Sequence, residues 1–154
     1  MRLSCRRAGQ AELNRKRRPF HEIEHTGDTG IEVGAPTRME PYARAAVAMA
    51  RLMVDEEGIE KRERRQVEAC DTDDADTMHD LLAAALNLFL IDSFIWCDAS
   101  AKEHAGNVIL VLEGESFDPK RHGLLGEIKA VTYHQLRVGR TPSGAWSARI
   151  IFDI

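Results

Sequence analysis

The C-terminal residues of the chain are the first candidate for metal chemistry. Apolar and polar residues alternate there as in a strand, and one face would carry Trp146, Ala148, Ile150, Phe152 and Ile154. A sheet would hold the Asp153 carboxylate and the α-carboxylate of Ile154 in fixed positions, and two adjacent carboxylates suit a hard cation. The alternative is a C-terminal strand in which both carboxylates are only solvated.

The segment His21–His25 matches H-E-x-x-H, the spacing found in zinc metalloproteases. In those enzymes a helix places both histidines on one face, one turn apart. Here Pro19 precedes the segment, Gly27 and Gly30 follow it, and the residues alternate with a period of two, which favours a strand. Histidines four residues apart on a strand lie about 13 Å from each other, whereas zinc ligands lie about 2 Å from the metal. A shared zinc ion is therefore not expected.

Four aspartates between residues 71 and 76 form an acidic cluster. The cluster lacks the later glycine and the distant bidentate glutamate of an EF-hand loop. Acidic side chains stabilise the positive N-terminal end of a helix, so we interpret the cluster as the cap of the next helix in preference to a cation-binding loop.

Charge is unevenly distributed along the 154 residues. Residues 1–18 hold seven basic side chains and one acidic one, and the remainder holds 14 basic and 24 acidic side chains, a net charge of −10. A basic arm can hold RNA phosphates; the alternatives are a tail without a role and a start codon assigned too early. We expect residues 1–18 to be disordered and residues 19–154 to form one domain. The acidic domain favours a cation site or a basic protein partner over a broad nucleic-acid surface.

Composition favours a cytoplasmic protein. Hydrophobic residues make up 44% of the chain, enough for a core, but no run of 18 apolar residues predicts a transmembrane helix. Cys5, Cys70 and Cys97 show neither metal-binding nor redox spacing, which indicates reduced thiols. No apolar segment follows the N-terminal arginines, so a secretory signal peptide is not expected.

Periodicity predicts two helices among several strands. A hairpin is expected over residues 20–33, with Asp28 in its turn, and a helix from a capping box of Thr37 and Glu40 to about Val54. A second helix is expected over residues 76–94. Further strands are expected over residues 60–71, 95–99, 107–113, 127–139 and 145–154, the last two forming a hairpin. This order indicates an α+β fold, with two main helices packed on a mostly antiparallel sheet.

Four segments resemble the motifs of one protein family, the archeases. Glu24–Ile31 is similar to E-H-T-A-D-x-G-I, Phe117–His122 to F-D-P-x-x-H, Glu127–His134 to E-[VI]-K-A-[VI]-T-Y-H and Ile151–Ile154 to I/V-F-D-I. Their order and spacing agree over residues 19–154. The chain departs from the pattern at three positions. The family usually has alanine in place of Gly27 and isoleucine or valine in place of Thr29, and it often has glutamate in place of Leu88. If that glutamate meets the partner, its replacement by Leu88 weakens docking.

The resemblance implies a small cytoplasmic protein in which two strand-helix-strand-strand modules are interwoven. Archeases are not ligases themselves: they assist the RtcB-type RNA ligase of tRNA splicing and RNA repair, which works through a guanylylated histidine with GTP and manganese. They promote guanylylation of the ligase and so restore its multiple turnover. They contact RNA only indirectly, through the ligase. The family's metal site would fall on Asp28, Asp153 and the C-terminal Ile154.

The expected ligands of that site are oxygens without a soft donor. Such sites prefer calcium, magnesium or manganese over zinc, and calcium is the expected ion. The ion would either be presented to the ligase during nucleotidyl transfer or order the terminus for docking. The candidate contacts with the partner or its nucleotide are His25, Lys129, Tyr133 and His134. The alternative is that these residues are ordinary surface and core residues of the sheet. A general protein-interaction or chaperone-like modulator is the alternative function.

Overall fold

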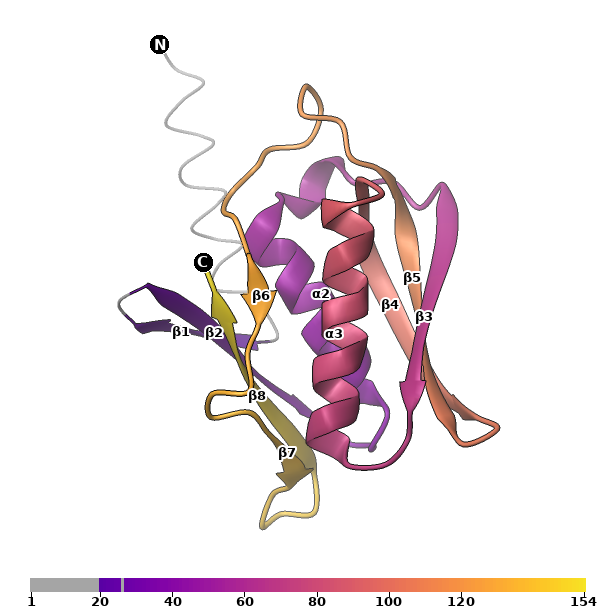
Figure 1. Ribbon diagram of the computed structural model, residues 1–154, viewed down its shortest axis with the longest axis vertical. Helices are drawn as coiled ribbons and strands as arrows, with labels where there is room; N and C mark the ends of the chain where they lie inside the picture. The colour runs from indigo at the N-terminus through magenta and orange to yellow at the C-terminus, as the bar shows by residue number, and fades with distance from the viewer. Residues whose placement is uncertain (1–19, 26) are drawn as a thin grey trace.

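Two helices lie between two antiparallel sheets in the computed structural model, which describes residues 20–25 and 27–154 (Figure 1). The elements, in chain order, are β1 (Phe20–His25), β2 (Asp28–Ala35), α2 (Glu40–Met53), the 3-10 helix η1 (Glu56–Gly58), β3 (Glu63–Cys70), α3 (Asp74–Leu90), β4 (Phe94–His104), β5 (Asn107–Ser116), β6 (Ala130–Val131), β7 (Arg137–Arg140) and β8 (Trp146–Asp153). The segment His21–His25 thus belongs to a strand, as predicted, and not to a metalloprotease helix.

The two sheets are interleaved along the chain. The first sheet has the order β1-β2-β8-β6, with β7 also paired to β8, and the second has the order β3-β5-β4. Strands β1 and β2 start the first sheet, the continuous unit β3-α3-β4-β5 then builds the second, and β6 to β8 return to complete the first. The predicted α+β class and the interwoven modules are therefore confirmed.

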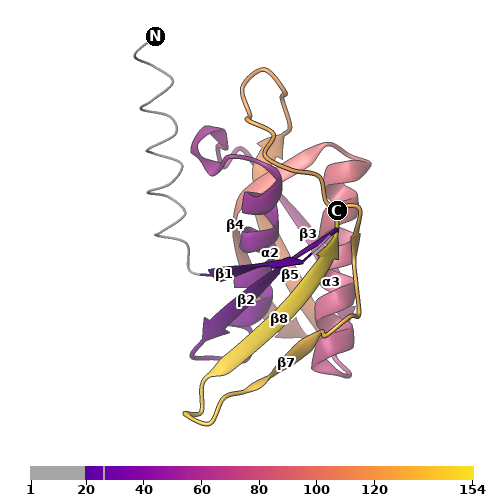
Figure 2. The ribbon, with the colours of Figure 1, turned by 90° about the vertical axis from the view of Figure 1, so that its left-hand side faces the viewer.

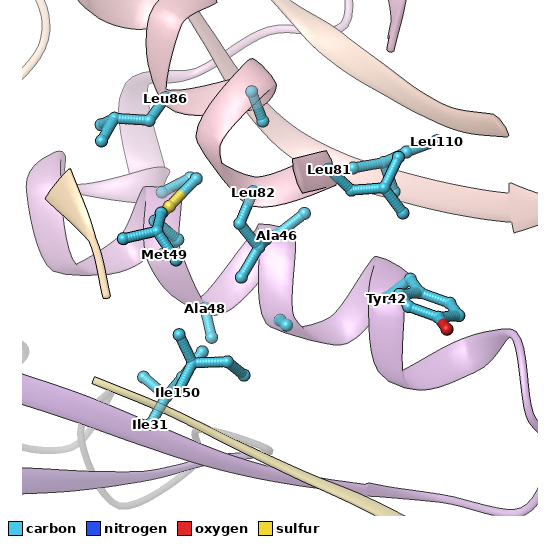
Figure 3. Close-up of a cluster of buried hydrophobic side chains, with 14 of the residues drawn as sticks. Ile31, Tyr42, Ala46, Ala48, Met49, Leu81, Leu82, Leu86, Leu110 and Ile150 are labelled. Carbon is cyan, nitrogen blue, oxygen red and sulfur yellow. The ribbon is translucent and has the colours of Figure 1, made fainter. Parts of the chain in front are cut away.

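The core lies where the helices meet both sheets. The core-facing stripe of α2 is buried at Tyr42, Ala45, Ala46, Met49 and Met53. Figure 3 shows side chains of α2 and α3 gathered above Ile31 of β2 and Ile150 of β8. Because the inner face of the first sheet supplies part of this core, burial fixes which residues of β2 and β8 point away from the helices.

The helix starts differ in how they are capped. Asp73 caps α3, because its side chain accepts hydrogen bonds from the backbone N–H groups of Ala75 and Asp76 at 2.9 and 3.2 Å. The predicted capping box of Thr37 is wrong: α2 begins at Glu40, with Met39 as N-cap and no side-chain cap. A proline in the first helical turn needs no N–H partner, which reduces the need for such a cap.

Two other aspartates of the acidic cluster form ion pairs with Arg38 and so connect the start of α2 to the unit that builds the second sheet. Arg38, which precedes α2, donates to Asp71 and Asp74 at 2.5 and 2.7 Å, and also to Glu103 at the end of β4. The hydrogen bonds with Asp71 and then Asp74 raise the pKa of Arg38, and the same guanidinium lowers the pKa of Asp71. The predicted capping role is therefore confirmed for Asp73, and Asp71 and Asp74 in addition form ion pairs that were not predicted.

The expected strand over residues 127–139 is interrupted. In this part of the chain only Ala130–Val131 and Arg137–Arg140 pair with β8. A turn separates them, and Gln135 in that turn has a φ of 53°. Ala130 lies opposite Asp153, so an unbroken strand would place Arg137 opposite Trp146; it lies instead opposite Arg149. The intervening turn takes up this three-residue slip, which polar-apolar alternation along one strand does not reveal.

Several expectations concern the chain as a whole. No helix among the described residues combines the length and apolarity needed to cross a membrane. Cys70 and Cys97 are free thiols, as predicted. Cys5 and the basic arm of residues 1–18 lie outside the described residues.

Candidate metal centre at the end of β8

Asp28 and Asp153 lie directly opposite each other on neighbouring strands. They are Cα partners in the antiparallel pair of β2 and β8. Opposed residues of such a pair point to the same face, with Cβ atoms about 4.5–5.5 Å apart, so both carboxylates stand on one side of the sheet. The prediction that Asp28 occupies the hairpin turn is wrong, because it is the first residue of β2. The register nevertheless brings Asp28 and Asp153 together.

The end of β8 is held from both sides. On one side β2 pairs with it up to Asp153. On the other side the backbone N–H of Lys129 donates to the Asp153 carbonyl at 2.8 Å, and Thr132 donates its backbone N–H and its hydroxyl to the Ile151 carbonyl at 3.1 and 2.9 Å. A strand end bonded on both edges does not fray as chain ends usually do. The segment Glu127–His134 therefore positions the terminus.

Alternation along β8 sets the face that the two aspartates share. Phe152 is fully buried on the inner face, so its neighbour Asp153 points outward. Gly30 permits close packing of the strands, because a Cβ at that position would lie 2.6 Å from Ile151 Cδ1 and 2.9 Å from the Ile150 carbonyl oxygen. The predicted buried face of the last strand ends at Phe152, since the Ile154 side chain is 44% exposed.

Three of the candidate partner contacts lie on the segment Glu127–His134, which forms a strap beside β8. Lys129, Tyr133 and His134 are all exposed, and Tyr133 stacks on the His79 ring at 3.9 Å between centroids. Partial burial and the carboxylates of Asp80 and Asp76 raise the pKa of Tyr133. The backbone of the fourth candidate, His25, lies opposite Asp28 in β1. Lys129, Tyr133 and His134 thus lie on one side of the end of β8, and the backbone of His25 lies beyond β2 on the other side.

Comparison with known proteins shows the family to which the chain belongs. The archease protein family (MTH1598/TM1083) matches residues 20–154. The chain belongs to the archease family. It is 35% identical over 140 residues to protein archease of Methanopyrus kandleri, a match that covers 88% of this chain and 99% of that protein. Protein archease of Pyrococcus furiosus is 32% identical over 141 residues, covering 89% and 99%. The solution structure of Methanobacterium thermoautotrophicum protein 1598 has a TM-score of 0.70 at 26% identity, covering 89% and 99%.

The donor set of this archease fits a hard cation. Asp28 and Asp153 offer carboxylate oxygens from opposite strands, and the α-carboxylate follows Ile154 directly. Among the side chains that the structure describes, no group of three or more His, Cys, Asp or Glu residues could hold an ion. Two side chains alone make a weak site, so a third oxygen donor would be needed to hold an ion. Oxygen ligands of this kind suit calcium, magnesium or manganese.

The F-D-P-x-x-H loop of this archease is built around a buried histidine. The His122 side chain is 2% exposed, and its Nδ1 accepts the backbone N–H of Asp118 at 2.8 Å. Its ring stacks on Phe117, and its Nε2 faces Glu115 Oε2 at 3.6 Å. These contacts tie the loop to the end of β5. The motif therefore has a structural role away from the aspartate pair.

Sequence reasoning missed His79, and its expectation that Leu90 and Ile91 are buried with the apolar stripe of α3 is wrong, because both are exposed. His79 supports Tyr133 by stacking and lies with its Nε2 3.2 Å from the Val131 carbonyl oxygen, a contact between α3 and β6 that no local pattern signals. Leu88 is half-buried and packs against the core. This archease thus uses a position that is often acidic in the family for packing.

Glu115 is expected to make the stability of the loop depend on pH. Burial by itself raises the pKa of Glu115, but hydrogen bonds from the Glu60 backbone N–H and the Arg121 guanidinium outweigh it and hold the pKa below its ordinary value of 4.5. A lowered folded-state pKa gives stability that is present above the ordinary value and is lost as pH falls through the folded value. Glu115→Gln should therefore lower the free energy of unfolding by about 1–3 kcal/mol at pH 7.

Urea unfolding of Glu115→Gln and the unchanged chain measures this effect. The difference in free energy of unfolding between the two proteins should shrink as pH falls from about 5 to about 3. Glu68→Gln, at an exposed position of β3, serves as the control and should leave the curve nearly unchanged. A gap that stays constant across this range would contradict a role for the Glu115 charge.

Proposed function

We propose that this archease activates an RtcB-type RNA ligase in tRNA splicing and RNA repair, by promoting ligase guanylylation and multiple turnover. It acts as a non-catalytic protein cofactor in the cytoplasm, and RNA joining is carried out by the ligase. Membership of the archease family supports the proposal. The observation that carries it is the register pairing of Asp28 with Asp153, beside a terminus bonded on both edges.

The residues of this chain then act by holding and presenting a divalent cation. Asp28, Asp153 and the α-carboxylate of Ile154 bind it, with calcium preferred and magnesium or manganese as alternatives. When bound, the ion supplies a fixed positive charge for phosphate or carboxylate oxygens. Without it three carboxylates repel one another, so a cation stabilises the local arrangement. The strap that bonds to Asp153 and Ile151 keeps the donors in place.

The surface around the aspartate pair is the proposed ligase contact. Lys129 offers a positive charge, and Tyr133 and His134 offer exposed rings with hydrogen-bonding groups. The stacking of Tyr133 on His79 reduces the entropy lost when a partner docks. The backbone of His25 lies opposite Asp28, which places this fourth candidate contact at the same end of the sheet. These contacts orient the ligase relative to the cation.

A multiple-turnover ligation assay tests the function. A purified RtcB-type ligase with GTP and manganese should stop near one product per enzyme, and addition of this archease should restore turnover. Asp28→Asn should lose at least about 90% of that stimulation, because one ligand loses its charge. Glu68→Gln, an exposed acid on the second sheet, should retain it. Equal stimulation by Asp28→Asn would contradict the role of the aspartate pair.

A general protein-interaction function is favoured by one other observation. Leu90, Ile91, Leu124 and Leu125 are exposed large apolar side chains, between 49% and 75% accessible. Exposed apolar groups can shield aggregation-prone partners. In that case the archease would keep the ligase soluble without changing its turnover, and Asp28→Asn would act like the unchanged chain.

A further inference from the structure

One edge of the first sheet is closed by a side chain of a helix. Strand β6 ends the strand order on this side of the sheet. In an antiparallel ladder, the backbone groups of alternate residues point toward the partner strand and away from it. Because Thr132 donates its N–H to the Ile151 carbonyl of β8, the carbonyl of the preceding residue, Val131, points away from β8. That carbonyl needs a partner from outside the sheet.

His79 of α3 supplies this partner. Its Nε2 lies 3.2 Å from the Val131 carbonyl oxygen. A carbonyl oxygen can only accept, so the contact is a hydrogen bond in which a protonated Nε2 donates. The His79 side chain is 20% exposed, which shelters the bond from most competing water. Figure 2 shows the strap, in orange, running beside α3. The hydrogen bond therefore joins the strap to α3 on the side opposite β8.

Two further contacts fix the imidazole ring of His79. Its Nδ1 lies 3.1 Å from Asp80 Oδ1, and the ring stacks on Tyr133 with 3.9 Å between centroids and 16° between planes. Asp80 is the next residue of α3, whereas Tyr133 belongs to the strap. The ring thus contacts the strap twice, through its edge at Val131 and through its face at Tyr133. A side chain held on several sides can fix the position of what it binds.

The part of the strap that His79 binds lies beside the end of β8. Ala130, the residue before Val131, is the Cα partner of Asp153. The backbone N–H of Lys129 donates to the Asp153 carbonyl at 2.8 Å. Movement of Val131 away from α3 would therefore be passed to the backbone that flanks Asp153.

We propose that His79 is a positioning residue for the candidate metal centre. By binding the Val131 carbonyl it keeps the strap against β8, and so it holds Asp153 and the α-carboxylate of Ile154 in place. Metal sites depend in the same way on outer groups that orient their ligands. Tyr133 is also a proposed ligase contact, so one ring supports both the partner surface and the terminus. The role in metal binding rests on the proposed function, whereas the role in holding the strap does not.

Three substitutions of His79 separate the hydrogen bond from the stacking. His79→Phe keeps a flat ring against Tyr133 but cannot donate to the Val131 carbonyl. His79→Gln keeps an N–H donor at a similar reach and loses the ring. His79→Leu removes both, and it serves in place of His79→Phe if that variant does not fold. Thermal melting shows which variants are folded.

Amide hydrogen exchange of the metal-free full chain, followed by NMR, tests the proposal. In His79→Phe and His79→Leu the amides of Lys129 and Thr132 should exchange at least about tenfold faster, because the unpaired carbonyl favours local opening of the strap. In His79→Gln they should stay within about threefold of the unchanged chain. The Asp71 amide, which donates to the Gly106 carbonyl beside the second sheet at 3.0 Å, is the internal reference and should not change.

Calcium titration gives a second readout. His79→Phe should bind calcium several-fold more weakly than the unchanged chain, and His79→Gln nearly as tightly. Equal acceleration of exchange in the Phe and Gln variants would overturn the proposal, because the ring and not the hydrogen bond would then hold the strap. Unchanged exchange in both would overturn it as well. If the unchanged chain binds no calcium, the proposed metal centre fails, and the exchange rates still decide whether His79 holds the strap.

Discussion

Gly114→Ala is expected to lower the free energy of unfolding by about 4 kcal/mol, the largest stability effect we predict. A Cβ at this position would lie 1.9 Å from the Ile95 carbonyl oxygen and 2.5 Å from Trp96 Cα. Both obstacles are backbone atoms, so no rotamer change relieves the overlap. The close approach arises at the bulge of β4, where the register with β5 shifts between Trp96 and Asp98.

Loss of this packing should reach beyond the second sheet. Trp96 is fully buried, and its indole N–H donates to the Ala46 carbonyl of α2 at 2.9 Å. Displacing the β4 backbone therefore disturbs the helix that packs on both sheets. Because the whole core is coupled in this way, we expect one cooperative transition at a lower urea midpoint with an unchanged slope.

Gly139→Ala is the matched control for this substitution. Gly139 lies in β7, and a Cβ there would meet nothing within 4 Å. Its free energy of unfolding should stay within about 0.5 kcal/mol of the unchanged chain. If Gly114→Ala and Gly139→Ala unfold at the same urea concentration, the bulge is not a fixed part of the folded state.

Sequence patterns predicted elements that are regular over their whole length. The core-facing stripe of α2 follows one helical period. In β8 the alternation predicted the burial of Ala148, Ile150 and Phe152, but Ile151 of the other face is buried as well and Ile154 is exposed. The segment 127–139 has the same alternation but includes a turn at Gln135 with positive φ. Hydrogen bonds of Thr132 and Lys129 to β8 decide its path, and these are long-range contacts that periodicity does not contain.

Sequence reasoning could name candidate residues for the site but could not supply their geometry. Family motifs named Asp28 and Asp153, and only the strand register places them opposite each other. His79 shows the opposite case, since it belongs to no recognisable motif. Its role depends on what the fold sets beside it, namely the Tyr133 ring. Sequence reasoning about single elements cannot supply such pairs.

Extending the C-terminus by two alanines is expected to lower calcium affinity at least about tenfold, because a charged ligand is removed from the site. The extension moves the α-carboxylate about 7 Å along the strand direction and leaves a neutral carbonyl at Ile154. Asp28 and Asp153 keep their positions, since their pairing depends on β2 and on the Lys129 hydrogen bond. Isothermal titration with calcium measures the change.

A two-alanine extension at the N-terminus is the matched control and should bind calcium like the unchanged chain. Thermal melting in excess EDTA should give the same midpoint for all three proteins, because the core beneath β8 ends at Phe152 and the Ile154 side chain is largely outside it. If the C-terminal extension binds calcium normally, the α-carboxylate is not a ligand. If it instead melts lower in EDTA, the terminus serves the fold, and the loss of affinity follows from a displaced strand.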